Sequence, residues 1–375
     1  MNRHSSARFR LSAMLLLFFA AAFLLHASRT GNTELYLLAA AVPGMMLLLL
    51  LFPGGTFFMD RPSLSAALSL CGFSILAPAS LFPDDAVSQG MRCAAGLFFL
   101  LAGTVYVRLF LPCVLSASLS AILGLGMISC PIWLPDIPFS LTTGGMVLLL
   151  LGIVSFLSVR LRLPALAAAA AGLLLFLTQR DFAAAAIWGV SSALIFWAAS
   201  GSSLWSVICL IVVTALFGGF VGFYPQSVVF DLPSRLSCLA AMPLLPPESV
   251  PQSSSAGAGS LFFLLGEQYG LIFLLCSVLL LILLLIRGTS LALHTRKSFH
   301  ASLSLGIVLL LGLQSLLFLG SATDILPLTG CSFPFMTSSI PDLFAQFFML
   351  GLLSGISCRN ESDLNEDARL AMLAR

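Results

Sequence analysis

Long apolar runs separated by short polar segments follow one another along almost the whole chain. A membrane-spanning helix needs about 20 predominantly apolar residues to cross a hydrocarbon core of about 30 Å. Two of the runs are weaker than the others, because 115–132 is interrupted by glycines and 163–178 is short and rich in alanine. The pattern predicts an all-α, polytopic integral membrane protein with about 10–12 transmembrane helices. The windows lie at residues 11–28, 34–52, 65–83, 92–112, 115–132, 141–159, 163–178, 182–200, 203–223, 260–286, 300–320 and 336–357.

Composition supports the same fold class and excludes several functions. Hydrophobic residues make up 59% of the chain and charged residues 9%, against about 25% charged in a typical soluble domain. No polar interval of domain size interrupts the apolar runs, so residues 1–375 are interpreted as a single membrane domain in the lipid bilayer. The net charge of +2 is too small to indicate nucleic-acid binding. The nine cysteines form no C-x-x-C pair and are interpreted as small buried hydrophobes.

Basic residues predict the orientation in the membrane. The first apolar run follows Arg3, Arg8 and Arg10 without a small-residue cleavage site, so it is expected to be a retained span. With both termini in the cytoplasm, most Lys and Arg residues fall on the inner side, as the positive-inside rule requires. The exceptions are Arg29, Arg92, Arg180 and Arg235.

Two segments lie outside the predicted spans. Residues 224–259 form a large loop that this orientation places outside the cell, and its proline and serine content is too high for a span. The loop can be a mobile lid or only a connector. Residues 359–375 are expected to form a cytoplasmic tail, as a short helix or a frayed end.

The last third of the chain resembles a known family. Residues 266–272 read Gly-Glu-Gln-Tyr-Gly-Leu-Ile, and residues 326–338 read Leu-Pro-Leu-Thr-Gly-Cys-Ser-Phe-Pro-Phe-Met-Thr-Ser. Both segments are similar to motifs of the SEDS family, the FtsW, RodA and SpoVE proteins. Weaker similarity lies upstream, in 179–183 (Gln-Arg-Asp-Phe-Ala) and around Trp133.

The resemblance implies a SEDS-like core over residues 90–357, with additional N-terminal helices within 11–83. It implies a role in peptidoglycan synthesis during division, elongation or sporulation, in the bacterial cytoplasmic membrane. The ligand would be a lipid II-type, undecaprenyl-linked precursor, and the partner a class B penicillin-binding protein. The resemblance implies no organic cofactor, although it allows a divalent cation.

The chain also departs from the family. The aspartate taken as catalytic in SEDS proteins lies eight residues before the motif glutamate, where this sequence has Gly259. The family's glutamate and lysine are missing from residues 142–148, and residues 338–341 replace its tyrosine and glycines. Two functions therefore remain open, an active peptidoglycan glycosyltransferase or a non-catalytic scaffold that regulates a penicillin-binding protein. A lipid or small-solute transporter is a third option, but the chain shows little of the charge pairing expected for it.

Glycosyl transfer from a lipid carrier needs a carboxylate to accept a proton and cationic help for the leaving diphosphate. Glu267 is the first candidate base, because an ionisable side chain at membrane depth is costly. It can instead form a structural hydrogen bond to a neighbouring helix. Glu248, in the long loop, can substitute for the missing aspartate or be a solvated acid.

The candidate substrate-binding residues are polar positions near the predicted outer ends of helices. Arg180 and Asp181 can bind an anionic headgroup or anchor the helix at the membrane interface. Arg235 can contact diphosphate or remain solvated, and Thr329 lies in a predicted tight re-entrant turn. Ser338 completes the set.

Overall fold

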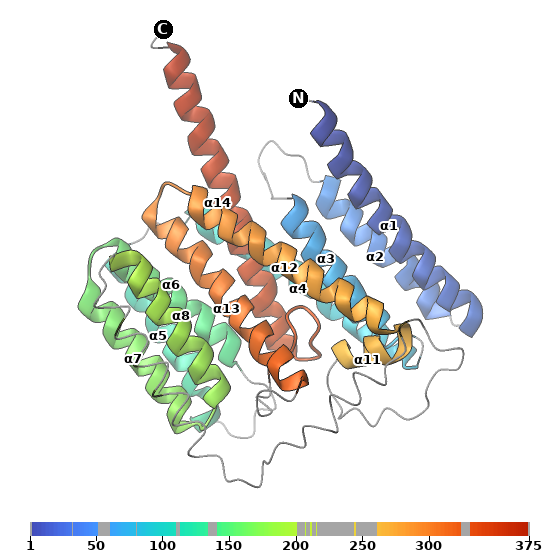
Figure 1. Cartoon of the computed structure of the whole chain (residues 1–375), viewed down its shortest axis with the longest axis horizontal. Helices are drawn as coiled ribbons and strands as arrows, with labels where there is room; N and C mark the ends of the chain where they lie inside the picture. The colour runs from blue at the N-terminus through green and yellow to red at the C-terminus, as the bar shows by residue number, and fades with distance from the viewer. Residues whose placement is uncertain are drawn as a thin grey trace. The chain divides into compact units, whose positions relative to one another are not determined.

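The protein is mainly helical in its described part (Figure 1). The computed structural model describes residues 2–31, 33–51, 61–79, 81–109, 113–133, 141–200, 261–323 and 331–373, together with four isolated positions between 201 and 260. Its regular elements are all α-helices, which confirms the predicted fold class.

Helices coincide with all but one of the predicted windows, and the window 203–223 lies outside the described residues except for single positions. The helices are α1 (Asn2–Thr30), α2 (Thr33–Leu51), α3 (Arg61–Leu76), α4 (Pro83–Leu109), α5 (Val114–Trp133), α6 (Thr142–Ser158), α7 (Arg162–Thr178), α8 (Phe182–Ser200), α11 (Leu261–Tyr269), α12 (Leu271–His294), α13 (Ser298–Ala322) and α14 (Ile340–Leu373).

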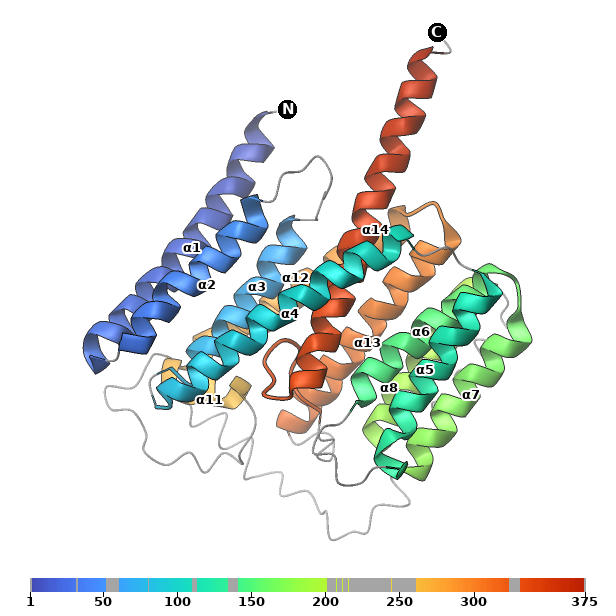
Figure 2. The same cartoon turned by 180° about the vertical axis from the view of Figure 1, so that it is seen from behind.

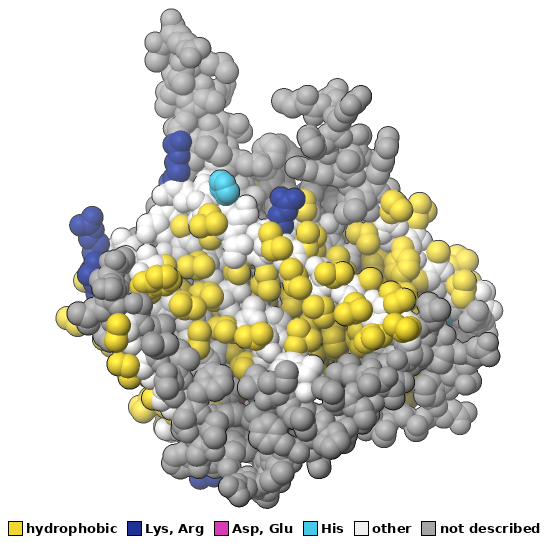
Figure 3. Space-filling model, in the orientation of Figure 1, with side chains coloured by type: hydrophobic (Ala, Val, Ile, Leu, Met, Phe, Trp, Pro, Cys, Tyr) yellow, Lys and Arg dark blue, Asp and Glu magenta, His cyan; other side chains and the backbone are white. Residues whose placement is uncertain are grey.

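Among the described residues, six helices are long and apolar enough to cross a membrane, namely α4, α5, α8, α12, α13 and α14. Shorter apolar stretches lie in α1, α2, α3, α6 and α7. The face that α12 presents is covered by hydrophobic side chains, including the exposed Leu275, Leu279 and Ile286 (Figure 3). Side chains of this kind are stable against lipid rather than water, so the chain is a multi-pass membrane protein.

Helix α4 begins at Pro83, nine residues before the predicted window. Proline fits the first helical position because its missing N–H would have no partner there. Asp84 and Asp85 follow in the first turn, where carboxylates interact favourably with the helix dipole. The hydropathy window did not include these first turns because their residues are mostly polar, although they are helical.

The predicted window 260–286 is two helices rather than one. Gly270 has φ of 90° and separates α11 from α12. This left-handed conformation is easily reached only by glycine, and it ends α11 after nine residues. Helix α12 then continues beyond the predicted end at Arg287 and Gly288 to His294.

The chain forms two compact units. The first unit comprises residues 1–105, 241–287 and 334–375, and the second comprises 106–240 and 288–333. In the first unit α1 and α2 pair closely, and α3 contacts α1, α2, α11 and α14. Both chain termini lie at one end of this unit (Figure 2).

Glycines bring α4 and α14 together within the first unit. A Cβ atom on Gly103 would lie 2.6 Å from the carbonyl oxygen of Phe348, and one on Gly351 would clash with the carbonyl oxygen of Leu100. The rings of Phe99 and Phe344 stack with centroids 4.5 Å apart beside this crossing. Small residues at membrane helix crossings allow such close backbone approach.

The second unit is built from α5, α6, α7, α8 and α13. Gly124 and Gly145 face each other where α5 packs on α6, so that a Cβ on Gly124 would lie 2.9 Å from the Gly145 carbonyl oxygen. The buried indole of Trp188 donates a hydrogen bond to the Ala169 carbonyl oxygen, at 3.0 Å, and thereby joins α8 to α7. Helix α13 packs against α6 and α8.

Gly351→Ala is expected to destabilise the protein by about 1–3 kcal/mol, because the added methyl group must push two backbones apart. Gly44→Ala is the matched control, since nothing lies within 4 Å of a Cβ at Gly44 in α2. Unfolding by SDS in mixed micelles measures both variants. Equal stability of the two variants would contradict the close crossing of α4 and α14.

Candidate functional site

A buried glutamine of α4 holds the segment that precedes α14. The Nε2 group of Gln89 donates to the Ser74 hydroxyl at 2.8 Å and to the Thr337 carbonyl oxygen at 3.0 Å. Gln89 is only 2% exposed, so both bonds are shielded from water. One amide therefore joins α3, α4 and the P-F segment, which we define as residues 334–339.

Arg92 extends this network one turn further along α4. Its Nη1 donates to the Ser338 carbonyl oxygen at 3.2 Å and to the Gln89 Oε1 at 3.4 Å. Ser338 was predicted as a substrate-binding residue, and its side chain is exposed. The backbone carbonyl oxygen of Ser338 accepts the hydrogen bond from the Arg92 guanidinium.

The P-F segment contains a strained backbone position. Phe335 has φ of 63°, which is rare for a bulky side chain. Its N–H donates to the Oε1 of Gln346 in α14 at 2.7 Å, and both residues are fully buried. Strain of this kind persists only where the surroundings over-determine the conformation, and it gathers at functional sites.

Helix α11 lies at the same end of the first unit as the P-F segment (Figures 1 and 2). Glu267 is half-buried there and has no hydrogen-bond partner among the described residues. Two positions on, the Tyr269 hydroxyl lies 2.8 Å from Nε2 of His26 in α1 and donates to the Leu76 carbonyl oxygen at 3.1 Å. Tyr269 thus fixes the end of α11 to α1 and α3.

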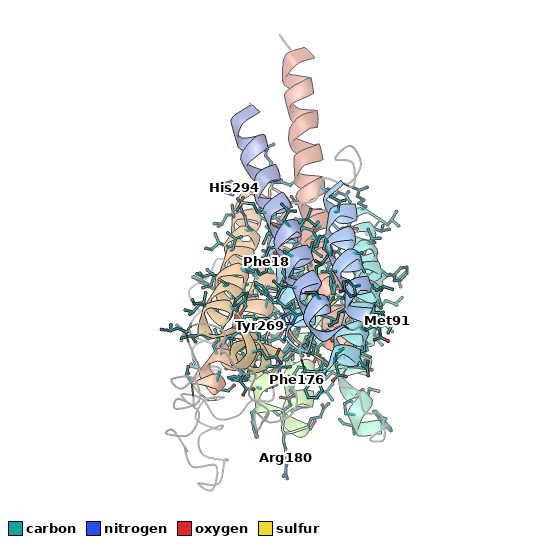
Figure 4. All side chains as sticks on the ribbon, turned by 90° about the vertical axis from the view of Figure 1, so that its right-hand side faces the viewer. Phe18, Met91, Phe176, Arg180, Tyr269 and His294 are labelled. Atoms are coloured by element: carbon teal, nitrogen blue, oxygen red, sulfur yellow. The ribbon has the colours of Figure 1, made fainter. Side chains whose placement is uncertain are left out.

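The predicted pair Arg180 and Asp181 lies in the second unit, in the turn between α7 and α8. Asp181 caps α8, because its Oδ1 accepts the N–H of Ala184 at 3.0 Å. Burial raises the pKa of Asp181, and the hydrogen bond from Ala184 opposes that rise. Arg180 has φ of 59° and projects away from the helices, at the end of the unit opposite His294 (Figure 4).

The remaining predicted positions lie outside the described residues. They are Glu248, Arg235, Thr329 and Gly259, the position of the family aspartate. The described part of the chain contains no group of three or more His, Cys, Asp or Glu residues that could hold a metal ion. The divalent cation that the resemblance allowed therefore has no ligand set in that part.

Gln89, Arg92 and Gln346 belong to the site but were not predicted from the sequence. The sequence contained one indication of a special role for Arg92, because it was one of the few basic residues on the predicted outer side. Gln89 and Gln346 carried none, since an amide within an apolar helix has many structural uses. Their partners lie 248 and 11 residues away along the chain.

Tyr269→Phe is expected to cost about 1 kcal/mol of stability, because two hydrogen bonds lose their shared hydroxyl. A double-mutant cycle with His26→Ala should give a coupling energy of about 0.5–1.5 kcal/mol in SDS unfolding. Tyr36→Phe on the exposed face of α2 is the matched control and should change little. Additive effects of the two site variants would disprove the link between α1 and α11.

Asp181→Asn keeps the cap acceptor but removes the ionisation, so it tests the raised pKa of Asp181. Below about pH 4 the wild-type carboxyl is protonated in both folded and unfolded chains, and the two proteins should be similar in stability. As the pH rises through the raised folded pKa, wild type should lose stability relative to the variant. Asp181→Ala should cost about 1 kcal/mol at every pH through the lost cap. A stability difference between wild type and Asp181→Asn that does not change with pH would refute the shift.

Comparison with known proteins identifies relatives of the region that carries these motifs. Residues 258–362 match the FtsW/RodA/SpoVE family of cell cycle proteins. The peptidoglycan glycosyltransferase RodA of Mycobacterium tuberculosis is 33% identical over 111 residues, which are 30% of this chain and 23% of that protein. The probable peptidoglycan glycosyltransferase FtsW of Geobacter metallireducens is 34% identical over 94 residues, 25% of each chain. The match thus spans about a quarter of the length of these relatives.

The fold extends the likeness beyond that region. The chain is similar in fold to a solved structure described as "Structural coordination of polymerization and crosslinking by a peptidoglycan synthase complex". The match covers 80% of this chain and 98% of the chain in that structure, with a TM-score of 0.61 and 18% sequence identity. At this identity the likeness concerns the fold. Residues 258–362, which include the motifs of α11 and the P-F segment, thus match the FtsW/RodA/SpoVE family, the SEDS proteins, and the fold of the chain resembles that of the solved structure.

Proposed function

We propose that this protein acts in bacterial peptidoglycan synthesis, where it binds a lipid II-type, undecaprenyl-linked precursor and transfers glycan from it. The observation that carries the proposal is the matched region 258–362, which contains α11 with Glu267 and the whole P-F segment. The first unit brings these two motifs to one end, although about 70 residues separate them along the chain. The matched relatives are named peptidoglycan glycosyltransferases, which supports glycan transfer as the reaction.

The reaction assigns a role to Glu267. A sugar hydroxyl of the acceptor attacks the anomeric carbon of the donor, the bond from that carbon to the diphosphate oxygen breaks, and the hydroxyl proton must be accepted. Glu267 is a half-buried carboxylate without a described partner, so its oxygens are available for that proton. Glu248 is the second candidate base, and Gly259 has no side chain with which to serve.

The leaving diphosphate needs positive charge nearby. From the sequence, the candidate polar contacts are Arg180, Asp181, Arg235, Thr329 and Ser338. Ser338 lies in the first unit, which also contains Glu267. A divalent cation belongs to the expectation for the family, but no step of this proposal passes through one.

We further propose that the protein lies in the cytoplasmic membrane with both termini inside and works with a class B penicillin-binding protein. Both chain termini lie at the same end of the first unit, which supports an even number of membrane crossings between them. The opposite placement of His294 and Arg180 in the second unit agrees with the basic-residue pattern. The solved relative supports the partner, since its description names a synthase complex that polymerises and crosslinks.

Lipid II polymerisation by the purified full-length protein tests the function. Wild type should form glycan, and Glu267→Gln should slow the reaction by about 10²–10⁴-fold, the usual contribution of a general base. Glu34→Gln, on α2 away from the matched region, is the control and should keep the wild-type rate. An unchanged rate in the Glu267→Gln, Glu248→Gln double variant would exclude both as the base.

Gly259→Asp separates the two functional alternatives. If wild type is inactive and only Gly259→Asp forms glycan, the chain is a SEDS scaffold that has lost the catalytic carboxylate. Co-purification with a class B penicillin-binding protein would then identify what it regulates. Glycan formation by wild type excludes the scaffold alternative.

A further inference from the structure

Arg92 is a cation within a membrane helix and has no acidic partner in the described part of the chain. It follows Pro83 by nine residues, which places it about 13 Å along the α4 axis. Its side chain is half-buried. Arg92 is also the first residue of the apolar window 92–112, and an arginine at the edge of an apolar span lies near the lipid headgroups, where phosphate is present.

The hydrogen bonds of Arg92 involve only one of its nitrogens. Both acceptors, the Ser338 carbonyl oxygen and the Gln89 amide oxygen, meet Nη1. Both acceptors are uncharged, so the positive charge is held in place and not neutralised. Nη2 and Nε have no hydrogen bond to the residues that the structure describes.

The nearest acids along α4 do not serve as partners. Asp85 precedes Arg92 by seven residues, about 10 Å along the helix axis, and both Asp84 and Asp85 are exposed. Exposed charges at that distance interact weakly. The guanidinium is therefore a preorganised donor with unused N–H groups.

We propose that Arg92 binds the phosphate group of a membrane lipid, with Gln89 and the Ser338 carbonyl positioning its guanidinium. The planar guanidinium of arginine suits the paired oxygens of phosphate, and lipid headgroups bring phosphate to the end of an apolar span. Within the proposed function the lipid is an isoprenoid diphosphate, the group that glycan transfer releases. This last assignment, unlike phosphate binding itself, rests on the proposed function.

The test measures lipid binding to the full-length protein in phosphatidylcholine nanodiscs, with undecaprenyl diphosphate as the probe. Arg92→Gln should weaken binding by about 10–100-fold, the usual effect of losing a charge-assisted hydrogen-bond donor. Arg92→Lys keeps the positive charge but lacks the planar guanidinium, so its lipid affinity should lie between those of wild type and Arg92→Gln. Arg108→Gln, exposed at the other end of α4, is the matched control and should change binding less than twofold.

Competing probes identify the source of the phosphate. Phosphatidylglycerol that displaces undecaprenyl diphosphate at equal concentration would keep phosphate binding but overturn the isoprenoid assignment. Inorganic diphosphate that binds as tightly as the lipid would overturn the lipid requirement. Equal affinity of wild type and Arg92→Gln would overturn the proposal, and if Arg92→Gln does not fold, wild-type affinity in Arg92→Lys would do so. Arg92-dependent binding in a protein that forms no glycan would uphold this site while the proposed function fails.

Discussion

Buried backbone that leaves the helical state must find hydrogen bonds within the protein, and the P-F segment depends on this constraint. Gln89 satisfies the Thr337 carbonyl oxygen from α4, and Gln346 satisfies the Phe335 N–H from α14. Both amides are buried, so no water competes with them. The unusual φ of Phe335 is kept because these bonds, and not local preference, determine the backbone there. The position of Arg92 depends in turn on the segment, through the Ser338 carbonyl.

Much of the fold could be predicted from apolar run length alone. Helices α5, α8 and α13 lie where long hydrophobic windows predicted them, since lipid imposes a uniform requirement on every span. The prediction was wrong where local backbone chemistry competes with hydropathy. Pro83 starts α4 well before its apolar part, and Gly270 divides the predicted window 260–286 into two helices.

The candidate site was less predictable, because its geometry depends on contacts between distant residues. Family resemblance correctly directed attention to the motif of α11 and to the P-F segment. Resemblance could not indicate that Ser338 acts through its carbonyl, since main-chain roles leave no trace in side-chain identity. Nor could it supply the partner of Tyr269, whose hydroxyl lies 2.8 Å from Nε2 of His26 in the N-terminal helix. The resemblance had treated that helix as an addition, whereas the contact makes it part of the support for α11.

Helix α14 continues without interruption from Ile340 to Leu373, so the last membrane span and the predicted tail are one rod. At about 1.5 Å per residue its 34 residues extend about 51 Å, against about 30 Å for the hydrocarbon core. Because the same rod carries Gln346 near its start, tilting or rotating its far end would act directly on the strained Phe335. Binding of a protein to the projecting end of α14 would therefore change the backbone conformation of the P-F segment at the other end of the helix.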